Sequence, residues 1–194
     1  MNTVSEHIAK PKKSKKSKLL TFEDYARMTP PDSSNYELHN RKLIFMPNPL
    51  FLHQDVSAAL FEALYFFINK HKLGKVVSAP MDVILTQHDT VQPDILFISK
   101  DRLNIIDEQI KGPPDLIVET LSDGNSAKEM SYKKHIYEST GVQEYWLINT
   151  TKKTVTQYKN EDGEFFPIHV LDTEGVLQSI VVEGFSFKIS DIFQ

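Results

Sequence analysis

Asp115-Leu-Ile-Val-Glu-Thr-Leu121 has the length of one β-strand and is apolar through most of that length. Such a run is typical of a strand that is buried on both faces near the middle of a sheet. A second run upstream, Val91-Gln-Pro-Asp-Ile-Leu-Phe-Ile98, has the same character. Pro93 cannot donate a hydrogen bond within a sheet, so we expect it at the start of that strand or at an edge.

Three other segments predict helices. Residues 50–72 carry apolar side chains at positions 52, 56, 59, 60, 63, 64, 67 and 68, which is the repeat of an amphipathic helix. The basic residues 70–72 suit its negative end, and Gly74 suits a C-terminal cap. Residues 127–140, which Gly141 ends, predict a second helix, and residues 21–27 predict a short one capped by Thr21.

The remaining segments combine apolar residues with turn signals. We expect a hairpin over residues 36–46 around a His39-Asn40 turn, and loops over residues 28–34 and 122–126. Further strands are predicted over residues 76–78, 81–85, 142–149, 154–158, 165–171 and 181–187. This mixed order predicts an α/β (α+β) fold, in which helices flank a central mixed sheet that C-terminal strands extend.

The composition indicates a soluble globular protein. Of the 194 residues, 40% are hydrophobic and 25% are charged. The chain has no cysteine, which excludes disulfides, thiolate zinc sites and cysteine nucleophiles. No apolar run has the length of a membrane-spanning helix, and the N-terminus has no apolar segment typical of a secretory signal. We therefore expect a cytoplasmic protein without a membrane partner.

Charge divides the chain into two parts. Residues 1–18 contain six lysines and one acid, whereas the other 176 residues contain 25 acids and 16 lysines and arginines. We expect residues 1–18 to be a disordered tail and residues 19–194 to form a single domain. The tail has two interpretations, a sequence-independent attraction to nucleic acid phosphates or a solubilising extension.

Two acids lie within the apolar runs, Asp94 and Glu119. A carboxylate near a buried strand is costly unless it is paired, hydrogen-bonded or bound to a metal. Two carboxylates on neighbouring strands can converge on one divalent cation, and Mg²⁺ and Mn²⁺ prefer oxygen ligands. The alternative for each acid alone is a position at a strand end that meets solvent.

The helix predicted over residues 127–140 supplies a candidate base. Glu129, Lys133 and Tyr137 share one helical face. If that face looks towards the two acids, Lys133 can reach a scissile phosphate and stabilise charge in the transition state. The alternative is an exposed ion pair between Glu129 and Lys133. Lys134, which points about 100° away from Lys133 on an ideal helix, is the competing basic residue.

The ordered set of motifs resembles the Uma2 family, formerly the domain of unknown function 820. The motifs are Tyr36-Glu37-Leu38, His53-Gln54, Val91-Gln-Pro-Asp94, Asp115-Leu-Ile-Val-Glu119-Thr-Leu-Ser122, and Lys133 and Tyr137 followed by Gly141-Val-Gln-Glu-Tyr-Trp146. They extend over nearly all of the expected domain. The family is similar to the PD-(D/E)xK restriction-endonuclease-like superfamily, so the resemblance implies a restriction-endonuclease-like core.

The resemblance implies a catalytic set. Pro93-Asp94 matches the PD pair and Glu119 matches the acidic residue of the (D/E)xK element, so both acids would bind Mg²⁺ or Mn²⁺. Leu121 stands where the standard motif has lysine. The family resembles nucleases in which that lysine has moved to the following helix, which implies that Lys133 takes its role.

The resemblance also implies three supporting residues. Glu37 matches an acidic residue that would be an outer or additional metal ligand. His53 would contact water or phosphate, although a lone histidine on an amphipathic helix is more often structural. Tyr137 would support Lys133 or pack in the core.

Several positions depart from the family pattern. Asn149 stands where aspartate is frequent, His39-Asn40 where Asp-Gly is frequent, and Asp123-Gly124 after Leu121-Ser122 where proline is usual. Glu144, Tyr145 and Trp146 admit two interpretations, core or dimer packing and a base-stacking platform, and packing is the more frequent role of such aromatics.

Three functions follow as expectations. The preferred one is a metal-dependent endonuclease that hydrolyses DNA phosphodiester bonds. The alternatives are an inactive nucleic-acid-binding or regulatory module, and a structural homodimer that keeps the nuclease fold. A homodimer is also expected for the active enzyme, from the family resemblance and the apolar C-terminal strands.

Overall fold

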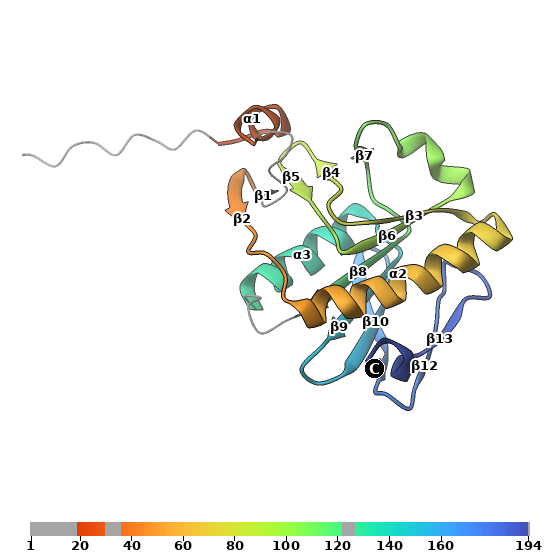
Figure 1. Cartoon of the computed structure of the whole chain (residues 1–194). Coiled ribbons are helices and arrows are strands. Elements are labelled where there is room, and N and C mark those ends of the chain that lie inside the picture. The colour runs from red at the N-terminus through yellow and green to blue at the C-terminus, as the bar shows by residue number, and fades with distance from the viewer. Residues whose placement is uncertain (1–18, 30–35, 122–126, 194) are drawn as a thin grey trace, which may run out of the picture.

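The computed structural model describes residues 19–29, 36–121 and 127–193 (Figure 1). The predicted tail 1–18, most of the predicted loop 28–34 and the predicted loop 122–126 lie outside the described residues. The helices are α1 (Phe22–Met28), α2 (Phe51–His71), α3 (Ala127–Thr140) and two short 3-10 helices, η1 (Lys100–Ile105) and η2 (Ile189–Ile192). The strands are β1 (Tyr36–His39), β2 (Lys42–Phe45), β3 (Gly74–Ser78), β4 (Val83–Thr86), β5 (Asp89–Val91), β6 (Ile95–Ser99), β7 (Ile110–Lys111), β8 (Leu116–Leu121), β9 (Glu144–Asn149), β10 (Thr154–Glu161), β11 (Glu164–Leu171), β12 (Val176–Gln178) and β13 (Ser186–Lys188).

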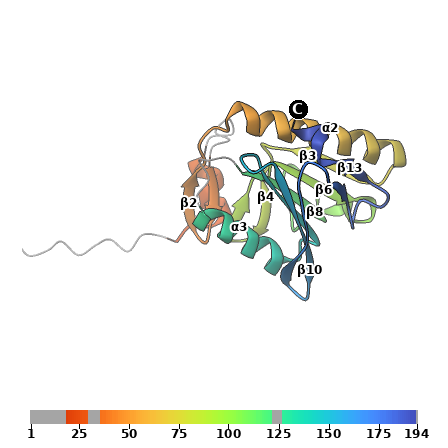
Figure 2. The ribbon, with the colours of Figure 1, turned by 90° about the horizontal axis from the view of Figure 1, so that it is seen from below.

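A six-stranded sheet with the order β11-β10-β9-β8-β6-β3 forms the centre of the molecule. Strands β8 and β9 run parallel and the other neighbours run antiparallel. Helix α2 covers one face of this sheet and α3 lies on the other, as the view in Figure 2 shows. The predicted arrangement, a central mixed sheet flanked by helices, is therefore present.

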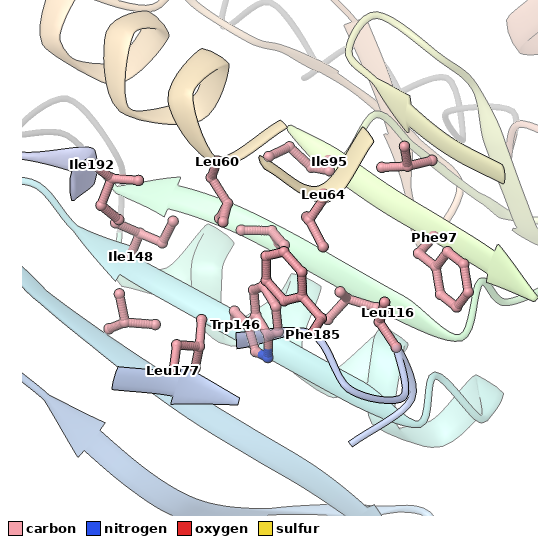
Figure 3. Close-up of a cluster of buried hydrophobic side chains, with 14 of the residues drawn as sticks. Leu60, Leu64, Ile95, Phe97, Leu116, Trp146, Ile148, Leu177, Phe185 and Ile192 are labelled. Atoms are coloured by element: carbon pink, nitrogen blue, oxygen red, sulfur yellow. The ribbon is translucent and has the colours of Figure 1, made fainter. Parts of the chain in front are cut away.

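Each face of the sheet has its own hydrophobic core. On one face, Leu60 and Leu64 of α2 pack with Trp146 of β9 (Figure 3). On the other face, Tyr137 of α3 belongs to a cluster with Tyr145 of β9. Successive side chains of a strand point to opposite faces, so Tyr145 and Trp146 enter different cores. Both are buried, which makes them packing residues rather than a stacking platform for bases.

A second sheet has the order β2-β1-β5-β4-β7 (Figure 1). Its β1–β2 hairpin pairs His39 with Lys42, so the turn residues are Asn40 and Arg41 rather than His39 and Asn40. Both turn residues have positive φ, 44° and 68°, and two-residue hairpin turns with positive φ fit the twist of the strands. His39 thus belongs to β1, on the same face as Glu37.

The prediction of one strand over residues 91–98 is wrong. Strand β5 ends at Val91 in the five-stranded sheet, and β6 begins at Ile95 in the six-stranded sheet. Pro93 lies in the connection, where no ladder hydrogen bond is required of it. The break places Asp94 at the point where the chain passes from one sheet to the other.

Two further expectations are corrected near the ends of elements. Residues 181–187 do not form one strand, because β13 begins at Ser186 and pairs with β12, which was not predicted. Helix α2 ends at His71, and its cap residue Lys72 adopts the left-handed conformation with φ 55°, whereas Gly74 already begins β3. Among the described residues, no helix has both the length and the hydropathy needed to cross a membrane.

Candidate active site

Asp94 and Glu119 lie on neighbouring strands. Asp94 directly precedes β6, Glu119 is inside β8, and these strands pair antiparallel. The pairing brings the backbone N–H of Thr120 to Asp94 Oδ2, to which it donates a hydrogen bond of 2.7 Å. His53 of α2 approaches the same oxygen with its Nε2 at 3.1 Å. Asp94 is thus held by a strand and a helix through one of its two oxygens.

Lys133 enters the same cluster from α3. Its ammonium lies 2.7 Å from Glu119 Oε1 and 3.1 Å from Glu37 Oε1. Tyr137, one turn later on the helix, donates a hydrogen bond of 2.6 Å to Glu119 Oε1. Lys133 is buried, so the alternative of an exposed ion pair with Glu129 is wrong. The helical face predicted for these residues does look towards the sheet.

Lys134 has a different role from its neighbour Lys133. Its ammonium pairs with Glu138 Oε2 at 3.0 Å on the surface of α3, and it also lies over the ring of Tyr158. The competing basic residue is therefore outside the cluster.

Glu37 is fully engaged within the protein. Its Oε1 accepts hydrogen bonds from the backbone N–H of Gln92, at 2.7 Å, and from Lys133. Its Oε2 lies 2.6 Å from Nε2 of His39. The residue is 1% exposed and lines the pocket described below, and each of its oxygens already has a partner within the protein. Glu37 is thus the counter-ion that holds Lys133, and its role as an outer or additional metal ligand stays a prediction.

His39 was not among the site residues predicted from the sequence. The sequence does contain an indication that His39 belongs to the site, because Glu37 and His39 are two residues apart and therefore share a face in any strand. Placing the turn one residue too early removed His39 from the strand and hid this relation. Tyr132 of α3 stacks on the His39 ring with 4.9 Å between centroids, which fixes the imidazole against Glu37.

A pocket of about 530 Å³ opens over the cluster. Asp94, Glu119 and Lys133 line it, together with residues of the β2–α2 connection, of the first turn of α2 and of α3. In Figure 1 this connection runs from the five-stranded sheet into α2. The pocket therefore lies where the two sheets and both long helices meet.

A family profile named Uma2, described as a putative restriction endonuclease, matches residues 22–190. The chain belongs to the Uma2 family. The match covers nearly all of the described residues, and it agrees with the resemblance of the motifs. No curated protein matches the chain.

The Uma2 chain is also similar in fold to a solved structure from Anabaena variabilis, described as a putative nuclease belonging to DUF820. The similarity covers 90% of this chain and 97% of that chain, with a TM-score of 0.76 and 18% sequence identity. At this identity the likeness establishes the fold and nothing finer. The predicted fold class is thereby confirmed.

Burial and neighbouring charges shift the pKa values of Glu119 and Glu37 in the Uma2 site in opposite directions. Burial raises the pKa of the Glu119 carboxyl to about 7, because its cost and the negative charges of Asp94 and Glu37 outweigh the ammonium of Lys133. Burial also acts to raise the pKa of Glu37, but Lys133 and His39 overcome it and lower the value to about 2. Glu119 is therefore the carboxyl that takes up a proton near neutral pH.

The pKa values of both basic groups, Lys133 and His53, are raised. Burial acts to lower the pKa of Lys133, but the carboxylates of Glu119 and Glu37 raise it above the ordinary lysine value. Burial likewise acts to lower the pKa of His53, and its contact with Asp94 raises the value overall. Near neutral pH the Uma2 site thus contains a charged Lys133, a charged Glu37 and a Glu119 that is partly protonated.

The donor set fits a hard divalent cation. Among the described residues, Asp94 Oδ1 and Glu119 Oε2 have no hydrogen-bond or ion-pair partner, and both residues line the pocket. Mg²⁺ is usually held by one or two carboxylates while it keeps several waters. No group of three or more acidic or histidine side chains in the described parts of the chain is arranged to hold a metal. Asp94 and Glu119 are the two residues of the Uma2 site that would hold such a cation.

Proposed function

We propose that this chain is a metal-dependent endonuclease that hydrolyses phosphodiester bonds in DNA, with Asp94 and Glu119 as ligands of Mg²⁺ or Mn²⁺. The observation that carries the proposal is the pair of partner-free carboxylate oxygens in one pocket with a buried ammonium. Membership of a family described as a putative restriction endonuclease supports it. So does the description of the Anabaena protein as a putative nuclease.

The ion would supply charge neutralisation at the scissile phosphate and a lower pKa for the attacking water. The protein residues prepare its ligands. Thr120 and His53 hold Oδ2 of Asp94 and leave Oδ1 free. Lys133 and Tyr137 hold Oε1 of Glu119 and leave Oε2 free. Each ligand therefore presents one oxygen in a fixed orientation, which lowers the reorganisation needed for catalysis.

Lys133 is the residue that would act on the substrate. An ammonium has three donor hydrogens, and Glu119 and Glu37 use two of them. The third is available for a phosphate oxygen or for the attacking water. Because the group is buried, its charge acts through a medium of low dielectric and stabilises a negatively charged transition state more strongly than an exposed lysine can.

Cleavage of supercoiled plasmid in Mg²⁺ or Mn²⁺ tests this proposal. We expect nicking by the wild type, and a loss of about a hundredfold or more in the Asp94→Asn, Glu119→Gln and Lys133→Met variants. Lys134→Met is the matched control, because it removes the adjacent lysine that lies outside the site, and it should cleave like the wild type. Equal cleavage by Asp94→Asn and the wild type would refute the proposed site.

Calorimetry with Mn²⁺ separates the proposal from its alternatives. We expect the wild type to bind Mn²⁺ and Asp94→Ala to lose that binding. A chain that binds DNA and not Mn²⁺, and that cleaves nothing, is an inactive binding module. A chain that binds neither and forms a dimer is the structural alternative.

A further inference from the structure

Cations are scarce around the candidate pocket, and this bears on which form of DNA it can take. Lys133 is the one lysine or arginine among the described residues that line the pocket, which also include four acids. Its charge is already shared between Glu119 and Glu37. Proteins obtain most of their affinity for duplex DNA from lysine and arginine contacts to phosphates. The lining therefore offers little of the attraction that a duplex needs.

The site is also recessed. Glu119 is 5% exposed and Lys133 is 2% exposed, although both line the pocket. The phosphates of a duplex lie on the outside of a wide and stiff cylinder. A single strand is narrow and flexible, so it can bring a phosphate into a recess that excludes the cylinder.

Exposed apolar side chains that adjoin the pocket lining in the sequence offer a different kind of affinity. Residues 46–50 line the pocket, and Phe45 and Phe51 flank that segment on either side. Phe45, Leu50 and Phe51, which we call the apolar rim, are 58%, 64% and 83% exposed. Aromatic side chains next to a nucleic acid groove stack on unpaired bases. The bases of a duplex are already stacked on each other and cannot use such a surface.

We propose, on the basis of the function proposed above, that the substrate is single-stranded or locally unpaired DNA, whose bases next to the scissile phosphate stack on the apolar rim with Phe51 as the main contact. The rim supplies affinity that the few cations of the pocket do not. Stacking is tolerant of sequence because every base has an aromatic face, so the enzyme recognises an unpaired strand rather than a sequence.

Binding of one labelled oligonucleotide, as a single strand and as a duplex, tests the proposal. Fluorescence anisotropy is measured with the full chain in Ca²⁺, to separate binding from turnover. We expect tighter binding of the single strand, and a Kd that rises about fivefold or more in Phe51→Ala. Phe66→Ala is the matched control, since Phe66 is on the same helix, 65% exposed and about 22 Å along its axis. Residues 1–18 are identical in all variants, so their lysines do not affect the comparison.

A second variant reports stacking directly. The chain has one tryptophan, Trp146, and it is buried. In Phe51→Trp the new indole is therefore the only exposed one. We expect single-stranded DNA to quench its emission, and duplex DNA to have little effect at the same concentration. Because the substitution keeps an aromatic face, single-strand affinity should be at least that of the wild type.

The outcomes separate this inference from the proposed function. Binding of the duplex as tightly as the single strand, or an unchanged Kd in Phe51→Ala, overturns the inference, even if plasmid cleavage depends on Asp94. Absence of cleavage with single-strand binding that depends on Phe51 overturns the nuclease proposal and leaves the binding surface. A change in oligomeric mass in Phe51→Ala, without a change in DNA binding, would assign the rim to a protein contact and also overturn the inference.

Discussion

Lys133 lies between two carboxylates in a buried site, so its charge supports the fold as well as the chemistry. Removing one partner of a buried ionic cluster leaves uncompensated charge and typically costs about 3–5 kcal/mol. We expect Lys133→Met to lower the free energy of unfolding by about 3 kcal/mol, measured by urea denaturation without divalent ions. Lys134→Met removes only a surface ion pair and should change the free energy of unfolding by less than about 1 kcal/mol. An unchanged urea midpoint in Lys133→Met would contradict the buried cluster.

The raised pKa of Glu119 predicts how ion binding depends on pH. With a pKa of about 7, the carboxyl of the metal-free protein gains a proton as the pH falls through neutrality, and a divalent cation must displace it. We expect the affinity for Mn²⁺, measured by calorimetry, to fall by up to about tenfold per pH unit below pH 7. Glu119→Gln should bind weakly at every pH, without this slope. An affinity independent of pH between about 6 and 8 would contradict the raised pKa.

The same pKa has the opposite consequence for folding. The folded protein holds the Glu119 proton more tightly than the unfolded chain, in which the carboxyl has its ordinary value of 4.5. Between about pH 4.5 and 7 the folded state therefore binds more protons, and the contribution of Glu119 to stability declines as the pH rises through that window.

At the scale of single residues, the sequence predicts some features of the candidate site and not others. Asp94 and Glu119 could be selected because acids in apolar strands need partners, and the resemblance to Uma2 selected Lys133 over Lys134. Which oxygen of each acid is engaged, and which is free, depends on contacts between residues far apart in the chain. The same holds for Glu37, whose partners come from β1, α3 and the turn before β6.

At the scale of elements, Glu144 joins the C-terminal segment to the central sheet. It is buried in β9, and its two oxygens accept hydrogen bonds at 2.6–3.0 Å from Trp146 Nε1, Gln157 Nε2, Ser179 Oγ and the backbone N–H groups of residues 180 and 181. Removing the carboxylate leaves these donors unpaired, at about 1–3 kcal/mol for each buried group that water cannot reach.

We therefore expect Glu144→Ala to lower the free energy of unfolding by about 3 kcal/mol or more, measured by thermal and urea denaturation. Glu144→Gln keeps one of the two acceptor oxygens and should lose less. Hydrogen exchange of the amides of residues 180 and 181 should accelerate in Glu144→Ala. Amides that stay as slow as in the wild type would show that other contacts hold this segment.

The same segment explains which elements the sequence could not predict. Helices α2 and α3 follow periodic patterns that are long enough to be unambiguous, and their predicted bounds differ from the structure by at most one residue. Residues 181–187 are apolar like a strand, but the backbone N–H of Val181 binds Glu144 and that of Val182 binds Ser179 Oγ, instead of a neighbouring strand. Strands β5 and β6 were merged because one apolar run continues across the change from one sheet to the other. Such partners are set by tertiary contacts, which local propensity does not encode.

At the scale of the whole molecule, β11 is the outer strand of the central sheet and carries exposed apolar residues, Phe166, Ile168 and Val170. Exposed apolar side chains that are grouped on one strand can pack against another chain, and most homo-oligomers are twofold dimers. We propose that two copies of the chain meet along β11.

Sedimentation velocity at micromolar concentration tests this pairing. We expect the mass of a dimer for the wild type and a shift towards the monomer for Val170→Lys, since a lysine on an edge strand opposes pairing. Phe66→Lys, which changes an exposed apolar residue of α2, is the control and should leave the mass unchanged. A wild type that sediments as a monomer would contradict the pairing.

The side chains of the candidate site are drawn from residue 37 to residue 137, across two sheets and two helices. No fragment shorter than residues 37–137 carries the complete set, and a chain that ends before Lys133 holds the acids without the lysine that pairs with them. On the proposed function, the chain can cleave DNA only after both helices have packed against the sheets. Incomplete chains made during biosynthesis are therefore inactive. The time course of Mn²⁺ binding during refolding would accordingly report when the tertiary structure is complete.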